Sequence, residues 1–228
     1  MSIFIDNLQM DAQIEEMPVR PTTAEYVAEA LRARIIRGEI EGGSPLRQDH
    51  VAREFNTSHV PVREAFQRLE AMGLVVALPR RGVRVTTLSQ DAIKEAVEMR
   101  GALEILALKH SVPRLGPVQI AQLEAAQERC FTAQSLVEWD EANCAFHDIL
   151  VKECRMPRLL AMLKQLQQTN SRYLFAAGLQ RGWQPRSDQD HCLIITALKD
   201  KNADRALQLL SRHIGTMERV GYSETIRG

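Results

Sequence analysis

The sequence predicts a mainly α-helical protein in two parts: an N-terminal winged helix-turn-helix and a C-terminal all-α bundle of about six helices. Three observations support this prediction. Two helical apolar patterns follow each other between residues 48 and 72, with a short turn between them. Two short β-rich runs then flank a basic turn at residues 79–82. From about residue 88 onward only helical patterns occur, and 228 residues are enough for two separate cores.

The first predicted helix begins after Thr22 or Thr23, because either hydroxyl group can cap it and apolar residues then recur at helical spacing. Gly38 ends this helix, and the glycine- and proline-containing residues 41–45 predict a turn. A helix of two turns is expected over residues 48–55. The chain therefore enters the motif through one long helix, one turn and one short helix.

The second helix of the motif begins after Ser58 and ends at Gly73, since glycine readily adopts the backbone conformation found just past a helix. Pro61 lies in the first turn, where its missing N–H removes no helical hydrogen bond. Residues 74–78 and 83–86 are rich in β-formers and predict two strands joined as a hairpin.

Proline and glycine residues separate the helical patterns of the C-terminal part. The boundary between the parts is predicted near residues 87–89, which gives domains at residues 20–87 and 88–228 after a loose arm at residues 1–19. Segments of this kind pack naturally as a bundle. The predicted helices span roughly residues 90–111, 117–133, 135–154, 157–178, 187–200 and 203–219.

Charge is distributed unevenly along the chain, although the formal net charge is zero. Residues 20–85 contain eleven arginines, eight acidic residues and no lysine, an excess of about three positive charges. Such an excess suits contacts with phosphate groups. A drift in surface composition would explain the same excess, so charge alone does not distinguish a phosphate-binding surface from an ordinary one.

The four cysteines form no CxxC pair, which favours free thiols in a reducing cytoplasm over a disulfide framework. No apolar run approaches the roughly 20 residues that a membrane span needs. The N-terminus lacks the basic and apolar segments of a signal peptide. We therefore expect a cytoplasmic protein without a membrane partner.

Residues at the start of the second helix are candidates for reading DNA, because the N-terminal end of a recognition helix meets base edges in the major groove. Arg63 can bind the O6 and N7 atoms of guanine, while Ser58 and the free N–H groups of the first turn can hold a phosphate. The alternative is that Arg63 pairs with an acid and that the arginines of the wing are solvated surface. The candidate DNA-binding residues are Arg47, Gln48, Ser58, His59, Val60, Arg63, Arg80, Arg81 and Gly82.

This segment resembles the winged helix of the GntR family of bacterial transcription regulators. The resemblance rests on Ser58-His59-Val60-Pro61-Val62-Arg63-Glu64, on Gly73-Leu74-Val75 and on Gly82 in the wing. It covers about 65 residues and implies binding to a double-stranded DNA operator. His59 departs from the arginine that the family usually has at this DNA-contacting position. A neutral histidine still offers one hydrogen bond to a base or phosphate, so the operator sequence stays open.

Three histidines, His147, His191 and His213, lie within otherwise apolar faces of three different predicted helices. Neutral imidazoles that converge in a bundle core form a metal site. Asn143 precedes His147 by four residues and shares its helix face, so both side chains can reach one ion. The alternative is three separate histidines, buried or exposed, and the spacing alone leaves both possibilities open.

The helical part resembles the FCD ligand-binding domain, the sensor of one large GntR subfamily. Many members bind a divalent metal through an Asp or Asn four residues before a His, plus two later histidines about 22 residues apart. The resemblance therefore implies a metal site at Asn143, His147, His191 and His213, with zinc as the main expectation and nickel, manganese or iron as alternatives. Asn143 replaces the commoner aspartate, and its neutral carbonyl oxygen is a weaker ligand. Asp140, one turn earlier, is expected to orient a metal ligand.

The same resemblance implies a small effector, usually an organic acid, beside the metal. Arg100 is a candidate to clamp a carboxylate, because guanidinium groups bind carboxylates through paired hydrogen bonds. An i, i+4 pair between Arg100 and Glu104 is the alternative. Arg172 and Tyr173 are further ligand-binding candidates, with surface and core positions as their alternatives.

These observations predict a metabolite-responsive transcription repressor that binds a pseudo-palindromic operator as a homodimer. A second hypothesis is a DNA-binding protein whose helical domain only dimerises. A third is a helical metalloenzyme. The third is disfavoured because the chain has no HExxH, no GxSxG and no P-loop motif. We therefore expect the protein not to be an enzyme.

Overall fold

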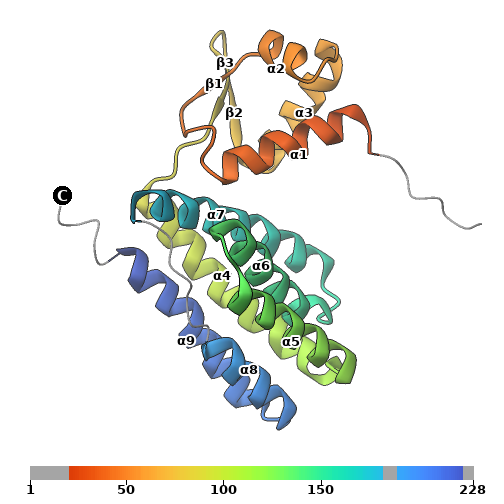
Figure 1. Ribbon diagram of the computed structural model, residues 1–228, viewed down its shortest axis with the longest axis vertical. Coiled ribbons are helices and arrows are strands. Elements are labelled where there is room, and N and C mark those ends of the chain that lie inside the picture. Colours follow the sequence, from red (N-terminus) through yellow and green to blue (C-terminus); the bar gives the residue numbers. More distant parts are fainter. Residues whose placement is uncertain (1–20, 182–188, 223–228) are drawn as a thin grey trace, which may run out of the picture.

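The computed structural model describes residues 21–181 and 189–222 (Figure 1). The described chain forms two parts, a small domain that carries a sheet and a helical bundle beneath it. The N-terminal arm expected at residues 1–19 lies outside the described residues. The predicted fold, a winged helix-turn-helix followed by an all-α bundle, is confirmed.

The N-terminal domain begins with a capped helix. Thr22 is the N-cap: its hydroxyl accepts a hydrogen bond from the backbone N–H of Glu25, and its own N–H donates to the Glu25 carboxylate. This reciprocal pair satisfies two N–H groups that the helix itself leaves free. The domain contains α1 (Thr23–Ile36), α2 (Gln48–Glu54), α3 (His59–Ala71), β1 (Pro45–Leu46), β2 (Val75–Leu78) and β3 (Gly82–Val85).

The wing is the hairpin of β2 and β3, and β1 extends it to a three-stranded sheet of order β1-β3-β2. Strand β1 was not predicted, because Pro45 closes a stretch that has the composition of a turn. Pro45 pairs with Arg84 at the edge of the sheet, where a residue without an N–H is tolerated. Gly82 has a φ of 77°, a conformation that glycine adopts without strain where the turn meets β3.

The small domain has its own core beneath the helix-turn-helix. One face of α3 is buried through Val62, Phe66 and Leu69, and packs on α1 and the sheet. A phenylalanine from the other domain completes this core: Phe175 belongs to α7 of the bundle and is 6% exposed. The two domains therefore share apolar packing at this point.

The bundle consists of six helices in the described part of the chain, close to the predicted ranges. Helix α7 runs three residues past Gly178, which the sequence suggested as its end. Among the described residues, no helix combines the length and apolar composition of a membrane span. The elements are α4 (Gln90–Ser111), the short 3₁₀ turn η1 (Val112–Arg114), α5 (Pro117–Thr132), α6 (Leu136–Lys152), α7 (Pro157–Arg181), α8 (Gln189–Lys199) and α9 (Ala203–Tyr222).

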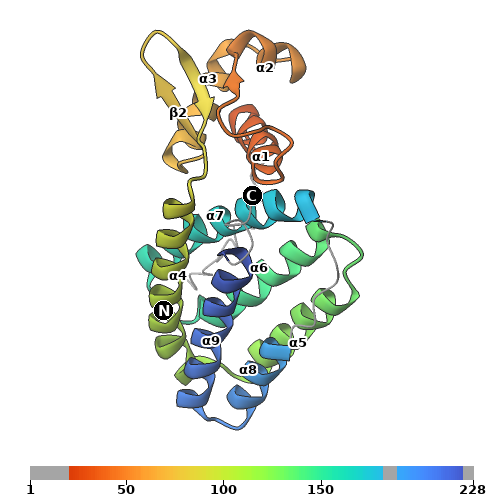
Figure 2. The same ribbon diagram turned by 90° about the vertical axis from the view of Figure 1, so that its left-hand side faces the viewer.

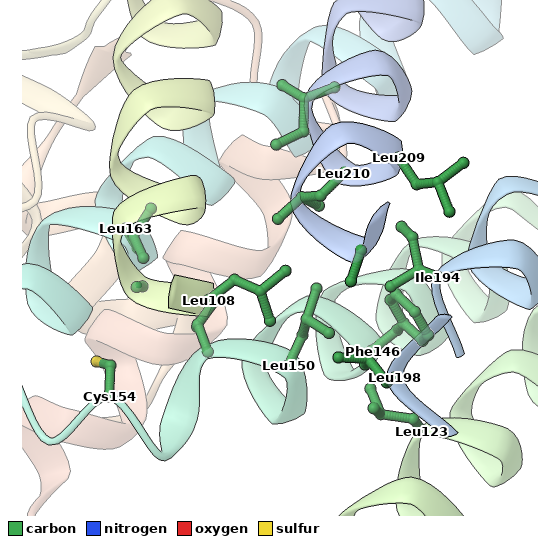
Figure 3. Packing of buried hydrophobic residues seen from close by; sticks show 14 of the residues in the cluster. Leu108, Leu123, Phe146, Leu150, Cys154, Leu163, Ile194, Leu198, Leu209 and Leu210 are labelled. Atoms are coloured by element: carbon green, nitrogen blue, oxygen red, sulfur yellow. The ribbon is translucent and has the colours of Figure 1, made fainter. Parts of the chain in front are cut away.

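All six bundle helices contribute to one apolar core (Figure 3). Leu108 of α4, Leu150 of α6 and Leu210 of α9 are fully buried in it. The core also includes Leu123, Phe146, Leu163, Ile194, Leu198 and Leu209. This packing holds the facing sides of α6, α8 and α9 in fixed register, which matters for the polar residues among them.

Helix α1 lies between the DNA-reading elements and the bundle, next to α7 (Figure 2). Two polar contacts join the domains there. The guanidinium of Arg172 donates to the carbonyl oxygen of Thr86 at 2.7 Å and to its hydroxyl at 3.0 Å. Arg37 lies 3.6 Å from the carboxylate of Glu141. Together with Phe175, these contacts fix how the small domain sits on the bundle.

We predict that Phe175→Ala weakens this junction. Truncation of a buried phenylalanine leaves a cavity and costs about 3–5 kcal/mol of stability, so the free energy of unfolding should fall by about that amount in urea titrations. Phe131→Ala is the matched control, because Phe131 is 46% exposed and should change stability by less than about 1 kcal/mol. Equal losses for both variants would contradict the assigned role of Phe175.

Candidate DNA-binding surface and candidate metal centre

The exposed face of α3 carries the residues that the sequence predicted to bind DNA. Because Val62 and Phe66 point into the core, the opposite side of the helix is left open. Ser58, His59 and Arg63 are exposed there, and Val60 is 53% exposed. Arg63 forms no hydrogen bond or ion pair with another described residue, so the expected alternative of a pairing acid is not found among them.

The first turn of α3 is open to an anion. Ser58 occupies the N-cap position, but its side chain makes no capping hydrogen bond. The N–H groups at this end therefore lack a side-chain partner, and the helix dipole adds a partial positive charge. Both features suit a phosphate. Asp49 lies 3.5 Å from Nδ1 of His59 and orients this ring beside the same turn.

Two further elements flank this turn. Arg80, Arg81 and Gly82 are exposed at the tip of the hairpin, which projects away from the bundle (Figure 2). Arg47 is exposed at the N-cap of α2, while Gln48 is half-buried behind it. The structure thus leaves the predicted arginines open to solvent on the end of the molecule farthest from the bundle.

The three predicted histidines meet in the bundle core. His147 of α6, His191 of α8 and His213 of α9 each place one ring nitrogen within 4.8 Å of the others. The rings of His147 and His191 are fully buried, and His213 is 7% exposed. Phe146 stacks on His191 with ring centroids 3.9 Å apart, which fixes the plane of that imidazole.

Each imidazole has an acceptor facing its Nδ1 atom. For His191 it is Oε1 of Gln127 at 2.6 Å, and for His213 it is Oδ2 of Asp190 at 3.7 Å. For His147 the nearest is Oε2 of Glu104 at 3.2 Å, but this pair lacks hydrogen-bond geometry and both atoms are buried without a hydrogen-bond partner in the described structure. The close acceptor at His191 favours protonation at Nδ1 and leaves its Nε2 lone pair free, as the residues behind metal-ligating histidines do.

The free lone pairs then face one another. Nε2 of His191 lies 3.1 Å from Nε2 of His213, and with both protons on Nδ1 these two atoms are acceptors in contact. Nε2 of His147 and Oδ1 of Asn143 are buried without a hydrogen-bond partner in the described structure. Orphaned buried acceptors cost about 1–3 kcal/mol each. A divalent cation bound by these atoms would remove the cost, so the residues present fit such an ion.

A proton on these buried histidines is disfavoured, so protonation does not readily take the place of a metal ion in satisfying the ring nitrogens. Burial lowers the pKa values of His191 and His213, and a proton on the neighbouring His147 would lower both further. Both rings are therefore neutral near neutral pH, which is the state that binds a metal. Burial alone would raise the pKa of Glu104, but Arg100 and His147 outweigh it and lower the pKa to about 2. Glu104 thus supplies a negative charge beside the histidines.

Arg100 is held by Glu104 and does not face an open pocket. Its Nε and Nη2 atoms donate to Oε1 of Glu104 at 3.2 and 3.1 Å, and both side chains are almost fully buried. This is the i, i+4 pair considered as the alternative. The hollow beside Arg100, which Val97 and Asn170 also line, is too narrow to admit a water molecule.

The structure gives other places to the remaining ligand candidates. Arg172 is engaged with Thr86 in the contact between the domains, because its guanidinium reaches the carbonyl oxygen and hydroxyl there. Tyr173 is half-buried against the bundle core. Asp140 accepts a hydrogen bond from the hydroxyl of Ser171 at 3.0 Å, so it orients no histidine as the sequence suggested.

Three residues that face the histidines were missed by reasoning from the sequence. Asp190 directly precedes His191, so the sequence already showed an acidic residue next to a candidate ligand. Glu104 was considered only as a partner of Arg100. Gln127 lies 64 positions before His191, and no local pattern indicates their contact.

A DNA-binding domain with an arginine-tipped wing, joined to a helical bundle with a buried polar centre, defines a transcription regulator. The family model for bacterial regulatory proteins of the gntR family matches residues 23–85, and the FCD domain model matches residues 95–216. The chain belongs to the GntR family and carries an FCD domain. It is a regulator of this family and not an enzyme.

Relatives with curated names are regulators of the same kind. The chain is 27% identical to the HTH-type transcriptional repressor GlaR of Escherichia coli strain K12 over 199 residues, which covers 82% of this chain and 90% of that protein. It is 28% identical to the gluconate operon transcriptional repressor of Bacillus licheniformis over 206 residues, 85% of this chain and 82% of that one. The solved structure of E. coli McbR/YncC matches with a TM-score of 0.78 at 22% identity, over 90% of this chain and 100% of that chain, which supports the fold.

We predict that the metal-free protein loses stability in acid. His191 and His213 take up protons only on unfolding, because their pKa values are lowered in the folded state. Below the ordinary histidine pKa of about 6.5, the unfolded state therefore binds more protons, and the free energy of unfolding falls by up to about 1.4 kcal/mol per pH unit for each group. Above about pH 7 these groups have no effect on stability.

Urea titrations of chelator-treated protein between pH 7 and pH 5 measure this slope. Acidic groups titrate over the same range, so a variant isolates the histidine contribution. His213→Gln removes one of the two groups and should show a smaller pH slope than the unchanged chain. Identical slopes would mean that His213 is not buried in its neutral form.

Proposed function

We propose that this protein is a transcription repressor whose affinity for DNA is set by a small organic acid and a divalent metal in the helical domain. The observation that carries the proposal is the buried centre in which one ring nitrogen each of His147, His191 and His213 lies within 4.8 Å of the others. The name of each relative above contains the word repressor, which supports repression over activation.

On DNA, the first turn of α3 would enter the major groove. Arg63 is the residue best placed to read a base, since it is exposed at this end of α3 without a partner among the described residues. Ser58, His59 and the N–H groups of the first turn would hold phosphate, and Arg80 and Arg81 would follow the backbone or minor groove. A homodimer would place two such helices on a pseudo-palindromic operator in the cytoplasm.

In the helical domain, the Nε2 atoms of His147, His191 and His213 and Oδ1 of Asn143 would hold the ion. Zinc suits this set best, because three imidazoles and one oxygen meet its preference for nitrogen and tetrahedral geometry. Nickel, manganese and iron are the alternatives. Bound metal would supply a positive charge that attracts an anionic effector.

Arg100 would take part in binding a carboxylate only after it leaves Glu104. In the structure both side chains are closed on each other, so an effector carboxylate would have to replace Glu104 as the acceptor. That exchange would move α4, which continues from the wing through residues 86–89. A coupling of about 1–3 kcal/mol between effector and operator is typical of such a link. The boundary of the two functional units would lie at residues 87–89.

The competing hypothesis is a helical domain that only dimerises. The absence of an open space beside Arg100 favours it. The orphaned acceptors at His147 and Asn143 disfavour it, because a purely structural core would not be expected to leave buried polar atoms without partners. Metal analysis distinguishes the two.

We predict that Arg63→Ala abolishes specific operator binding while the fold is retained. Loss of a bidentate contact to guanine costs about 1–3 kcal/mol per recognition helix, and a dimer loses two such contacts. Fluorescence anisotropy with labelled operator DNA measures the affinity. Arg68→Ala is the matched control on the same helix, since Arg68 pairs with Glu25 on the protein surface. Retained operator affinity in Arg63→Ala would refute the role of Arg63.

We predict that the double variant His147→Ala/His191→Ala loses bound metal, because two of the four proposed ligands are removed. Elemental analysis by mass spectrometry should find about one divalent ion per chain in the unchanged protein and none in the variant. His110→Ala is the control, since His110 is exposed at the end of α4. Unchanged metal content in the double variant would show that the ion binds elsewhere.

A further inference from the structure

A second cavity lies between the two domains, apart from the histidine centre. Its walls come from α1 of the DNA-binding domain and from α6 and α7 of the bundle, and its volume is about 230 Å³. We call it the interdomain cavity. We propose that it binds a small zwitterion, a molecule of the amino-acid type with one ammonium and one carboxylate group. The site is separate from the metal centre and does not depend on it.

The first argument is the acidic wall that α6 presents. Asp140 and Asp148 line the cavity from successive turns of one helix face, with Cys144 between them at four-residue spacing. Glu141 lies beside them. Carboxylates are the acceptors that an ammonium group needs, and several on one wall form a site for it.

Asp140 is the carboxylate best suited to an ammonium ion. It is 8% exposed, and its nearest partners are neutral: the hydroxyl of Ser171 donates at 3.0 Å, and the thiol of Cys144 lies at 3.9 Å. Burial raises the pKa of this carboxyl, and the hydroxyl of Ser171 and the more distant charge of Arg100 only partly offset it. A bound ammonium would stabilise the charged form that burial disfavours.

The second argument is the set of cations on the other walls. Arg32 and Arg37 enter from α1, and Lys164 enters from α7. Arg32 is already held bidentately by Glu29 at 2.6 and 2.7 Å, so it is the least available. Lys164 is exposed, and Arg37 lies 3.6 Å from Glu141, longer than a strong charged hydrogen bond. Lys164 is therefore the cation most available to a ligand carboxylate, whereas Arg37 would have to turn away from Glu141.

The third argument is the balance between the walls. The lining contributes three cations and three acids, with the acids on α6 and the cations on α1 and α7. A net anion would meet the carboxylates, and a net cation would meet the arginines and the lysine. A zwitterion can pair its ammonium group with the acids and its carboxylate with the cations. Ala33, Ile36, Val137 and Phe175 give the same cavity an apolar surface for a small side chain.

The position of the cavity gives such a ligand a route to the DNA-binding domain. Phe175 lines the cavity and also inserts into the core of the small domain. Ser171, which bonds Asp140, directly precedes Arg172, the residue that holds Thr86. A ligand that draws α1 toward α6 would shift these contacts. This last step rests on the proposed function as a regulator, whereas the binding site itself does not.

Isothermal titration calorimetry of the full, chelator-treated chain with each proteinogenic amino acid tests the site. At least one should bind once per chain. Its N-acetyl derivative lacks the ammonium and its methyl ester lacks the carboxylate, so each should bind at least about tenfold more weakly, which corresponds to about 1.4 kcal/mol. No binding by any amino acid, or equal binding of the N-acetyl derivative, would overturn the proposal.

Substitutions test where in the protein the ligand binds. Asp140→Asn keeps the size of the side chain, and Lys164→Ala changes an exposed residue, so both should fold and should weaken binding at least about tenfold. Lys109→Ala, an exposed lysine on α4, is the matched control for Lys164. The double variant His147→Ala/His191→Ala should bind within about twofold of the unchanged chain. Loss of binding in that variant, with Asp140→Asn and Lys164→Ala unaffected, would place the ligand at the metal centre and overturn the assignment.

A separate measurement of operator affinity tests whether the ligand affects DNA binding. Saturation with the bound amino acid should change operator affinity at least about threefold, and Lys164→Ala should remove this response. Operator affinity that is identical with and without the amino acid would refute the link. Because the calorimetry uses neither DNA nor metal, a failure of the repressor hypothesis cannot be mistaken for a failure of the cavity site.

Discussion

Three imidazole rings buried between α6, α8 and α9 impose the constraint on which the helical domain depends. The Nε2 atoms of His191 and His213 are 3.1 Å apart, and Gln127 and Asp190 face the opposite nitrogens. When both rings carry their proton on Nδ1, the two Nε2 lone pairs repel each other, and burial, which lowers both pKa values, opposes a second proton on either ring. A divalent cation would satisfy both atoms, which is the basis of the proposed metal site. Five of the six described bundle helices contribute to this centre, since Glu104 belongs to α4 and Gln127 to α5.

Helix α4, which contributes to the histidine centre, also leads to the junction with the DNA-binding domain. Glu104 joins His147 to Arg100 on α4, the helix that follows the wing. On the other side, Arg172 of α7 holds Thr86 at the end of the wing. Helix α4 begins at Gln90, directly after the wing, and Arg172 contacts Thr86, so both lie next to residues 86–89 at the junction of the domains. The interdomain cavity lies beside the contact of Arg172, because Phe175 and Ser171 line it. Under the two proposals, a small molecule would act on this junction from either place.

The sequence predicted the elements well because their signals are local. Thr22, Pro61 and Gly73 mark helix ends by their own backbone and capping properties, and the histidines lie at regular helical positions. Strand β1 was missed because its pairing with β3 is a tertiary contact. Arg172 was assigned to a ligand pocket because the sequence shows neither the direction of its side chain nor its distant partner, Thr86. Gln127 was missed for the same reason. The histidines that meet in the bundle core could thus be singled out from the sequence, whereas the residues that face them depend on packing between helices.

The most direct test of this account is anomalous X-ray diffraction from crystals of the protein, with data collected on both sides of the zinc absorption edge. The account predicts an anomalous peak enclosed by His147, His191 and His213, with the carbonyl oxygen of Asn143 in its coordination shell. It also predicts that the two Nε2 atoms of His191 and His213 remain separated by the ion and do not bond to each other. Two observations together would contradict the central claim. The first is electron density that shows a direct hydrogen bond between these two rings. The second is the lack of an anomalous peak there at the zinc edge and at the edges of nickel, iron and manganese.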